Sequence, residues 1–214
     1  MTKEQLAAIV PVIKKHDLLV ISDEIYAELT YGAKHASIAS FKDMCGRTVL
    51  INGFSKAFAM TGWRVGFVCA PAEIDEAMFK IHQYTILCAP QMSQRAALCA
   101  LKDGFSDGFA SVEEMRAEYN RRGRFLVNSF NSLDLNCFPP RGAFYVFPSV
   151  ESTGLNGEEF ANRLLEKYKV AVVPGSAFGA AGENFVRCSY ATSMSQLSAA
   201  IERITEFVNL IKGT

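Results

Sequence analysis

Residues 49–66 read VLINGFSKAFAMTGWRVG, and they carry the clearest structural signal in the chain. It opens as a short, continuous apolar run, which is typical of a strand covered on both faces of a sheet. Lys56 and Arg64 then follow among small and apolar neighbours. Burying two cations without a negative group is costly, so the stretch predicts an anion site just beyond a strand. Ser55 and Arg64 suit phosphate oxygens, because a hydroxyl donates one hydrogen bond and a guanidinium donates two parallel ones. Lys56 is left for covalent chemistry.

Outward from this stretch, strand and helix patterns alternate, which indicates an α/β protein. Strands are expected at 18–21, 49–51, 65–69, 143–147, 170–173 and 185–190. Helices are expected at about 2–16, 71–87, 91–102, 112–130, 157–168 and 194–211. Thr2 with Gln5, and Ser193 with Gln196, have the spacing of capping boxes. The long helix from residue 112 is the expected bridge between two domains, one at 1–111 and one at 112–214.

A second polar cluster follows the apolar run at 18–21 and reads Ser22-Asp23-Glu24-Ile25-Tyr26. Ligands of open α/β sheets bind beyond the carboxyl ends of the strands, so Asp23 is a candidate site residue. The same residues also fit a purely structural interpretation, in which Asp23 caps a turn and Tyr26 packs on the core. These residues alone leave both interpretations open.

Composition narrows the class of protein. The 22 basic side chains balance the 22 acidic ones, and no basic patch predicts nucleic-acid binding. The apolar runs are far shorter than the ~20 residues of a membrane span, so we expect no membrane association and a cytoplasmic location. The six cysteines lack any CxxC pair and the three histidines are scattered, so we expect buried free thiols, without disulfides or a metal site.

Several segments, in the same order along the chain, resemble the class I and II aminotransferases. They are SK at 55–56 with TGWRVG at 61–66, DEIY at 23–26, GAFY at 142–145, VVPG at 172–175 and VRCSYA at 186–191. The resemblance covers essentially the whole chain and is strongest to the aspartate and aromatic branch. It implies the fold of the fold type I pyridoxal-phosphate transferases. Residues 1–111 would form the C-terminal part of the large cofactor-binding domain, and residues 112–214 a complete small α/β domain.

The resemblance also implies a role for each candidate residue. Lys56 would bind pyridoxal phosphate covalently and move the proton at the substrate Cα. Asp23 would hold the pyridine nitrogen protonated, and Tyr26 would donate a hydrogen bond to the ring oxygen. Ser55 and Arg64 would bind the phosphate. Arg187 would bind the substrate α-carboxylate, where its residue type alone would suggest an exposed arginine on an edge strand.

The implied activity is transfer of an amino group between an amino acid of the aspartate or aromatic type and a 2-oxo acid, in a homodimer. Members of the family are about twice as long, so we expect a truncated chain that is inactive alone. Two alternatives stay open. The first is other pyridoxal-phosphate chemistry, a β-lyase or a cyclopropane-forming synthase. The second is the aminotransferase-like effector domain of a transcription regulator.

Overall fold

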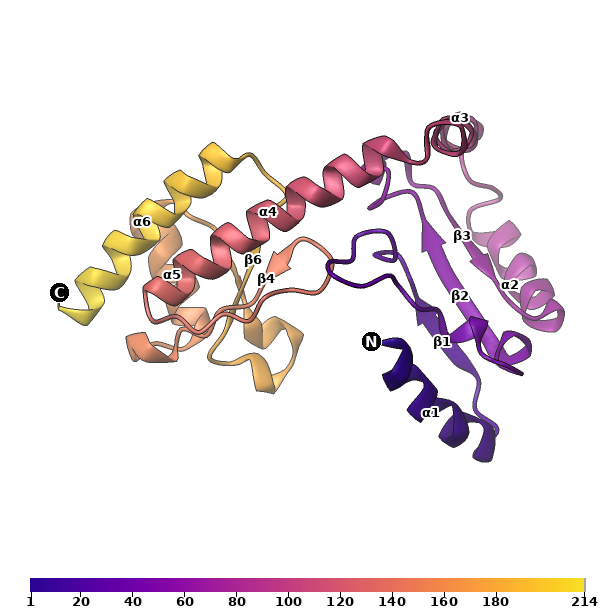
Figure 1. Cartoon of the computed structure of the whole chain (residues 1–214), viewed down its shortest axis with the longest axis horizontal. Helices are drawn as coiled ribbons and strands as arrows, with labels where there is room; N and C mark the ends of the chain where they lie inside the picture. Colours follow the sequence, from indigo (N-terminus) through magenta and orange to yellow (C-terminus); the bar gives the residue numbers. More distant parts are fainter. Residues whose placement is uncertain (214) are drawn as a thin grey trace. The chain divides into compact units, whose positions relative to one another are not determined.

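The computed structural model describes residues 1–213, and the chain divides into two compact units, Met1–Glu114 and Met115–Thr214 (Figure 1). The first contains α1 (Lys3–Lys15), β1 (Val20–Asp23), β2 (Thr48–Gly53), β3 (Gly66–Cys69), α2 (Ala72–Thr85) and α3 (Gln91–Asp107). Helix α4 (Ala110–Ser132) begins in the first unit and continues into the second. The second unit also contains β4 (Tyr145–Val146), α5 (Gly157–Tyr168), β5 (Val173–Pro174), β6 (Val186–Ser189) and α6 (Met194–Lys212). This is the predicted α/β class.

The first unit is built on a three-stranded sheet in the order β1-β2-β3. Strands β1 and β2 run parallel, with Asp23 opposite Ile51, and β3 returns antiparallel to β2. Helix α1 has the predicted capping box of Thr2 and Gln5, and its apolar face places Leu6 and Ile13 in a small core. Since β1 and β2 are parallel, their carboxyl ends lie at the same edge of the sheet.

The expectation that these strands are covered on both faces is wrong in this structure. Ile21 on β1 is 75% exposed, and every residue of β3 is exposed. Strands β1 and β3 are the edges of the sheet, and the described residues leave much of these side chains exposed. Short apolar runs predict strands correctly, but burial depends on what packs against them.

The second unit has its own antiparallel sheet, in the order β4-β6-β5. Its core includes Phe130 of α4, Phe160 of α5 and Phe207 of α6. Tyr190 is fully buried, and its hydroxyl donates to the carbonyl of Ala143 at 3.2 Å. A buried phenol usually needs such a partner, so this bond fixes the chain beyond β6 against the segment before β4.

Several predicted boundaries differ from those in the structure, and one predicted capping box is incomplete. Helix α3 continues past Gly104 to Asp107, because the residue in the left-handed conformation that ends it is Gly108. Strand β5 is only two residues long, where 170–173 was expected. The second capping box is half formed: Ser193 accepts from the amide of Gln196, and no reciprocal bond is seen in the described residues.

The expectation of buried thiols holds for two cysteines only. Cys137 and Cys188 are buried, and burial raises the pKa of Cys137 to about 11 and that of Cys188 to about 12. All six cysteines are free thiols. The four exposed ones are Cys45, Cys69, Cys88 and Cys99. Three of these lie next to apolar residues that are exposed as well, namely Val68, Leu87 and Leu98.

No helix within residues 1–213 is long and apolar enough to cross a membrane. The same residues contain no group of three or more His, Cys, Asp or Glu side chains that could hold a metal ion.

Candidate active site

The candidate site lies at the carboxyl ends of β1 and β2. Asp23 is the last residue of β1, and the turn that carries Ser55 and Lys56 begins directly after Gly53, the last residue of β2. Because the two strands are parallel and adjacent, both turns leave the sheet at one edge. The topology therefore brings two segments together that are separated in sequence by β2 and the loop before it.

The lysine turn is held by its own apolar residues. The amides of Phe58 and Met60 donate to the carbonyl of Phe54 at 3.2 and 3.3 Å. Phe54 and Met60 are buried in a cluster with Ala97 of α3. Lys56 lies between these anchors and is half-buried. The sequence thus buries the neighbours of Lys56 and leaves its side chain at the surface of the turn.

Two glycines allow the strands on either side of this turn to approach closely. Gly53 pairs with Gly66 across β2 and β3. A Cβ added at Gly53 would lie 2.9 Å from the Cα of Gly66, and one added at Gly66 would lie 3.0 Å from the carbonyl oxygen of Asn52. A side chain at either position would displace the backbone immediately before Lys56.

Lys56 and Tyr26 meet in the structure. The Nζ atom of Lys56 lies 5.7 Å from the centroid of the Tyr26 ring, a distance at which an ammonium is attracted to an aromatic face. Tyr26 comes from the turn after β1 and Lys56 from the turn after β2. The contact joins the two sequence motifs at one place.

Asp23 has features of both sequence interpretations. Its Oδ1 atom accepts a hydrogen bond from the amide of Ile25 at 3.1 Å, which caps the turn as the structural interpretation predicted. The side chain is nevertheless exposed at the edge of the sheet shared with Lys56. A carboxylate held in this way keeps acceptor capacity for a further donor.

Arg64 differs from expectation. The sequence argument placed it among buried cations, but it is exposed, in the left-handed conformation (φ 52°) at the end of the short 3-10 turn Thr61–Trp63. Its Nη1 atom donates to the carbonyl of Thr61 at 2.7 Å. The burial argument therefore fails for Arg64, although its guanidinium is tied locally to the same loop as Lys56. Ser55 is half-buried.

Arg187 belongs to the second unit, where it lies on β6. Its guanidinium carbon is 4.5 Å from the ring centroids of both Tyr145 and Phe178. Two aromatic rings thus contact one guanidinium, and the side chain is half-buried. The interpretation as a freely exposed arginine does not fit this packing.

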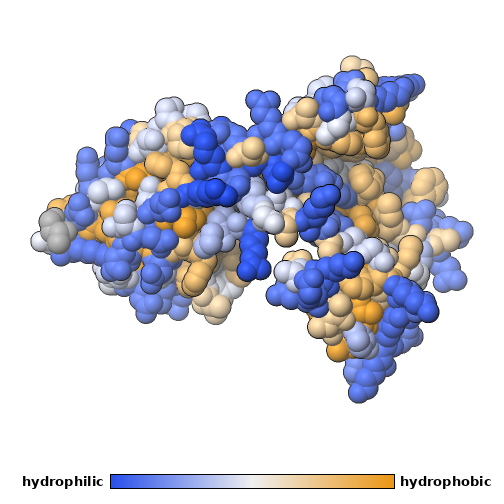
Figure 2. Space-filling view, in the orientation of Figure 1, coloured by the Kyte–Doolittle hydropathy of each residue, from blue (hydrophilic) through white to orange (hydrophobic). Residues whose placement is uncertain are grey.

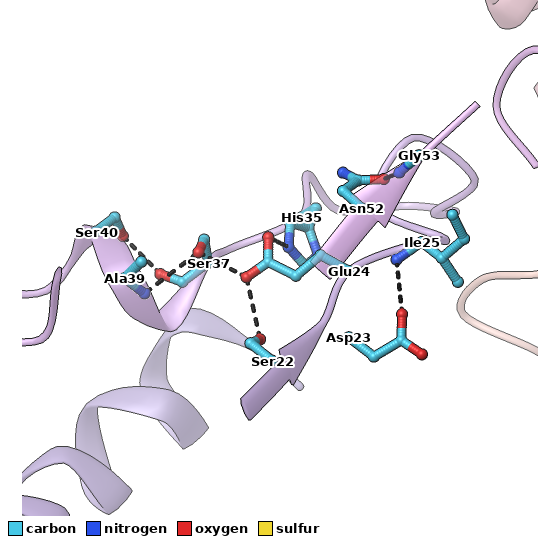
Figure 3. Close-up of polar contacts among 10 residues, drawn as sticks. All are labelled: Ser22, Asp23, Glu24, Ile25, His35, Ser37, Ala39, Ser40, Asn52 and Gly53. Atoms are coloured by element: carbon cyan, nitrogen blue, oxygen red, sulfur yellow. Dashed lines mark hydrogen bonds and ion pairs between the residues drawn. The ribbon is translucent and has the colours of Figure 1, made fainter. Parts of the chain in front are cut away.

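Sequence reasoning missed the polar cluster next to Asp23. Figure 3 shows the Glu24 carboxylate receiving hydrogen bonds from Ser22 and Ser37 and paired with the His35 ring. The available signal was an acidic residue immediately after an apolar strand, with a serine two positions before it. The other two partners lie in a loop whose path the sequence did not reveal.

Known proteins similar to this chain are aminotransferases. The family model described as "Aminotransferase class I and II" matches residues 1–204. The aspartate aminotransferase of Pyrococcus abyssi is 48% identical over 100% of this chain and 55% of its own length. The aromatic-amino-acid aminotransferase 2 of Thermococcus litoralis is 45% identical over 95% of this chain and 52% of its own.

The solved structures agree. The crystal structure of the aromatic aminotransferase from Pyrococcus horikoshii OT3 superimposes with a TM-score of 0.94 at 48% identity, covering 99% of this chain and 56% of that one. The chain spans about half the length of the curated relatives it matches.

Proposed function

Because the chain belongs to the class I and II aminotransferases, we propose that it supplies the cofactor lysine of an enzyme that moves an amino group between an amino acid and a 2-oxo acid. The observation that carries the proposal is the meeting of Lys56 with Tyr26 at the edge of the sheet that also presents Asp23. Members of this family depend on pyridoxal phosphate.

The residues fit that cofactor by their chemistry. Pyridoxal phosphate has an aldehyde, a ring nitrogen, a ring hydroxyl and a phosphate. An amine, a carboxylate, a phenol and a guanidinium with a neighbouring hydroxyl are their natural partners, and Lys56, Asp23, Tyr26, Arg64 and Ser55 provide this set within the first unit. When bound, the cofactor supplies an electron-withdrawing ring that stabilises negative charge at the substrate Cα.

Each of these side chains then has a separate proposed role. The Nζ of Lys56 would hold the cofactor covalently, and the same amine would be the group that moves a proton at the substrate Cα. The carboxylate of Asp23 would accept a hydrogen bond from the ring nitrogen and so favour its protonated form. The hydroxyl of Tyr26 donates to the ring oxygen, and Ser55 and Arg64 bind the phosphate.

We assign Arg187 to the α-carboxylate of the substrate. Contact with Tyr145 and Phe178 restrains the plane of its guanidinium, so less freedom is lost when its paired N–H groups bind a carboxylate. The names of the relatives support a substrate of the aspartate or aromatic type.

We propose further that residues 1–111 belong to the large domain and residues 112–214 to the small domain of a cytoplasmic homodimer, and that the chain does not act alone. A working enzyme would also need what corresponds to the remaining part of the relatives' length.

The test is a reconstituted enzyme, made by co-expressing this chain with the part of the Pyrococcus abyssi relative that it does not match. Amino transfer from aspartate and from phenylalanine to 2-oxoglutarate is measured with and without pyridoxal phosphate. We expect activity that needs both polypeptides, the cofactor and Lys56, and that survives substitution of the exposed Lys80 on α2 by alanine. Full activity in the Lys56→Ala variant would refute the proposal.

A further inference from the structure

The buried carboxylate of Glu24 is unexplained by the proposed function. Glu24 is only 6% exposed, although it stands between Asp23, which is exposed, and a surface turn. An ionised carboxylate taken out of water carries a large free-energy cost unless hydrogen bonds replace its hydration. The burial of the Glu24 carboxylate therefore calls for a structural or functional reason.

Three side chains provide that replacement. Ser37 donates to Oε1 of Glu24 at 2.6 Å and Ser22 donates to the same atom at 3.1 Å. The Nε2 atom of His35 lies 2.8 Å from Oε2. We call these four residues, Ser22, Glu24, His35 and Ser37, the Glu24 cluster. Figure 3 shows it closing the loop at 35–37 onto the end of β1.

The backbone of Glu24 is fixed as firmly as its side chain. Its amide donates to the carbonyl of Ile51 at 2.8 Å, which extends the pairing with β2 by one residue past Asp23. Its carbonyl accepts from the amide of Ala27 at 2.9 Å, which starts the turn that carries Tyr26. Glu24 therefore ties the strand end to the turn.

Alternation along the strand connects the cluster to the candidate site. Successive side chains of a strand point to opposite faces, so Ser22 and Glu24 share one side and Asp23 takes the other. Drawing Glu24 into the cluster sets the rotation of the backbone at Asp23. It also sets the direction in which the chain leaves toward Tyr26.

We propose that Glu24 is a positioning residue: its cluster holds Asp23 and Tyr26 in the orientation that the cofactor requires. This inference rests on the proposed function, which assigns Asp23 and Tyr26 to the cofactor. Loss of the cluster frees the strand end and lowers cofactor affinity, while Lys56 itself is untouched.

Three variants separate geometry from charge. Glu24→Ala removes the acceptor for all three donors. Glu24→Gln is the conservative variant: its oxygen can still accept from Ser22 and Ser37, and its amide can donate to the neutral ring of His35. Glu28→Ala is the matched control, because Glu28 is exposed on the same turn and lies outside the cluster. Should Glu24→Ala not fold, His35→Ala combined with Ser37→Ala removes two of the three donors instead.

The first measurement needs no cofactor. Hydrogen exchange is followed in the 214-residue chain at the amides of Ile25 and Ala27, which donate to Asp23 and Glu24. We expect about tenfold or more faster exchange in Glu24→Ala, and wild-type exchange in Glu24→Gln and Glu28→Ala. The second measurement is the dissociation constant of pyridoxal phosphate in the reconstituted enzyme, well below the unfolding midpoint of each variant. We expect it to rise about tenfold in Glu24→Ala and to be restored in Glu24→Gln.

The results of the two measurements either support or overturn the positioning role of Glu24. Unchanged exchange in Glu24→Ala overturns the inference at its structural step. Faster exchange with unchanged cofactor affinity overturns the positioning role, and so does damage by Glu24→Gln equal to that by Glu24→Ala. A wild-type reconstituted enzyme that does not retain pyridoxal phosphate refutes the proposed function and, with it, the assignment on which the positioning role depends.

Discussion

The ammonium of Lys56 lies over the ring of Tyr26, 5.7 Å from its centroid. These residues stand 30 positions apart in the chain and meet because their turns leave two parallel, neighbouring strands at one edge. Every role proposed for the first unit depends on this relationship.

The glycine pair before the lysine turn gives a prediction about stability. A Cβ at Gly53 would meet the Cα of Gly66, so Gly53→Ala should lower the free energy of unfolding by about 1–3 kcal/mol. Gly46→Ala is the control in the same unit, because nothing lies within 4 Å of its added Cβ and its φ is not positive. Urea unfolding of the first unit measures both. Equal stability of the two variants would contradict the close approach of β2 and β3.

Arg187→Lys should weaken substrate binding in the reconstituted enzyme. Lysine keeps the charge but loses the paired donors and the stacking on Tyr145 and Phe178, which should cost about 1–3 kcal/mol, or roughly one to two decades in kcat/KM. The loss should fall on the KM for the amino acid more than on cofactor retention. Arg163→Lys, at an exposed position on α5, is the control. An unchanged KM would place Arg187 outside the substrate site.

The cysteines should react in two classes. Iodoacetamide at about pH 8 should modify the four exposed thiols and spare Cys137 and Cys188 until the chain unfolds, because burial blocks access and raises the pKa of each thiol well above this pH. Mass spectrometry of the peptides measures the pattern. Rapid modification of Cys188 in the folded chain would contradict the packing of the second unit.

The same pKa shifts fix the sign of a pH effect. The folded state holds these two protons more tightly than the unfolded chain, whose thiols have a pKa near 9. Their stabilising contribution is complete below about pH 9 and is lost as the pH rises through 11 to 12. Unfolding midpoints from pH 8 to 11 should therefore fall at the alkaline end.

Apolar side chains at the surface of the first unit predict self-association. Tyr84 at the end of α2 is 87% exposed, Leu87 between α2 and α3 is 76% exposed, and Met92 of α3 is 77% exposed. Figure 2 shows such residues reaching the surface in the part of the view that holds α2 and α3. Contiguous exposed apolar surface usually marks a contact region. Sedimentation velocity should show concentration-dependent association of the 214-residue chain, reduced by Tyr84→Glu with Leu87→Lys. A monomer at every concentration would contradict this.

Local signals in the sequence predicted most of the elements. The capping box at Thr2 and the spacing of apolar residues located α1, and α5 has its predicted bounds because Asn156 caps its first turn and Lys169 ends it in the left-handed conformation. The sequence also placed Asp23 and Lys56 each just after a strand, and the family resemblance implied that both serve one cofactor.

Features that depend on distant packing could not be predicted in this way. The exposure of Ile21 and Arg64 depends on which elements cover them, and the apolar or charged character of the residues does not specify that. The Glu24 cluster requires the loop at 35–37 to fold back on β1. The periodic spacing of apolar residues does not predict the path of a loop.

The most direct test of the central claim is reductive trapping of the cofactor. The reconstituted enzyme is loaded with pyridoxal phosphate, reduced with borohydride and digested, and the labelled peptide is identified by mass spectrometry. We expect label on Lys56, none on that peptide in Lys56→Ala, and unchanged labelling in Lys80→Ala. Label of equal strength on any other lysine, or in the Lys56→Ala variant, would contradict the assignment of Lys56 as the residue that holds the cofactor.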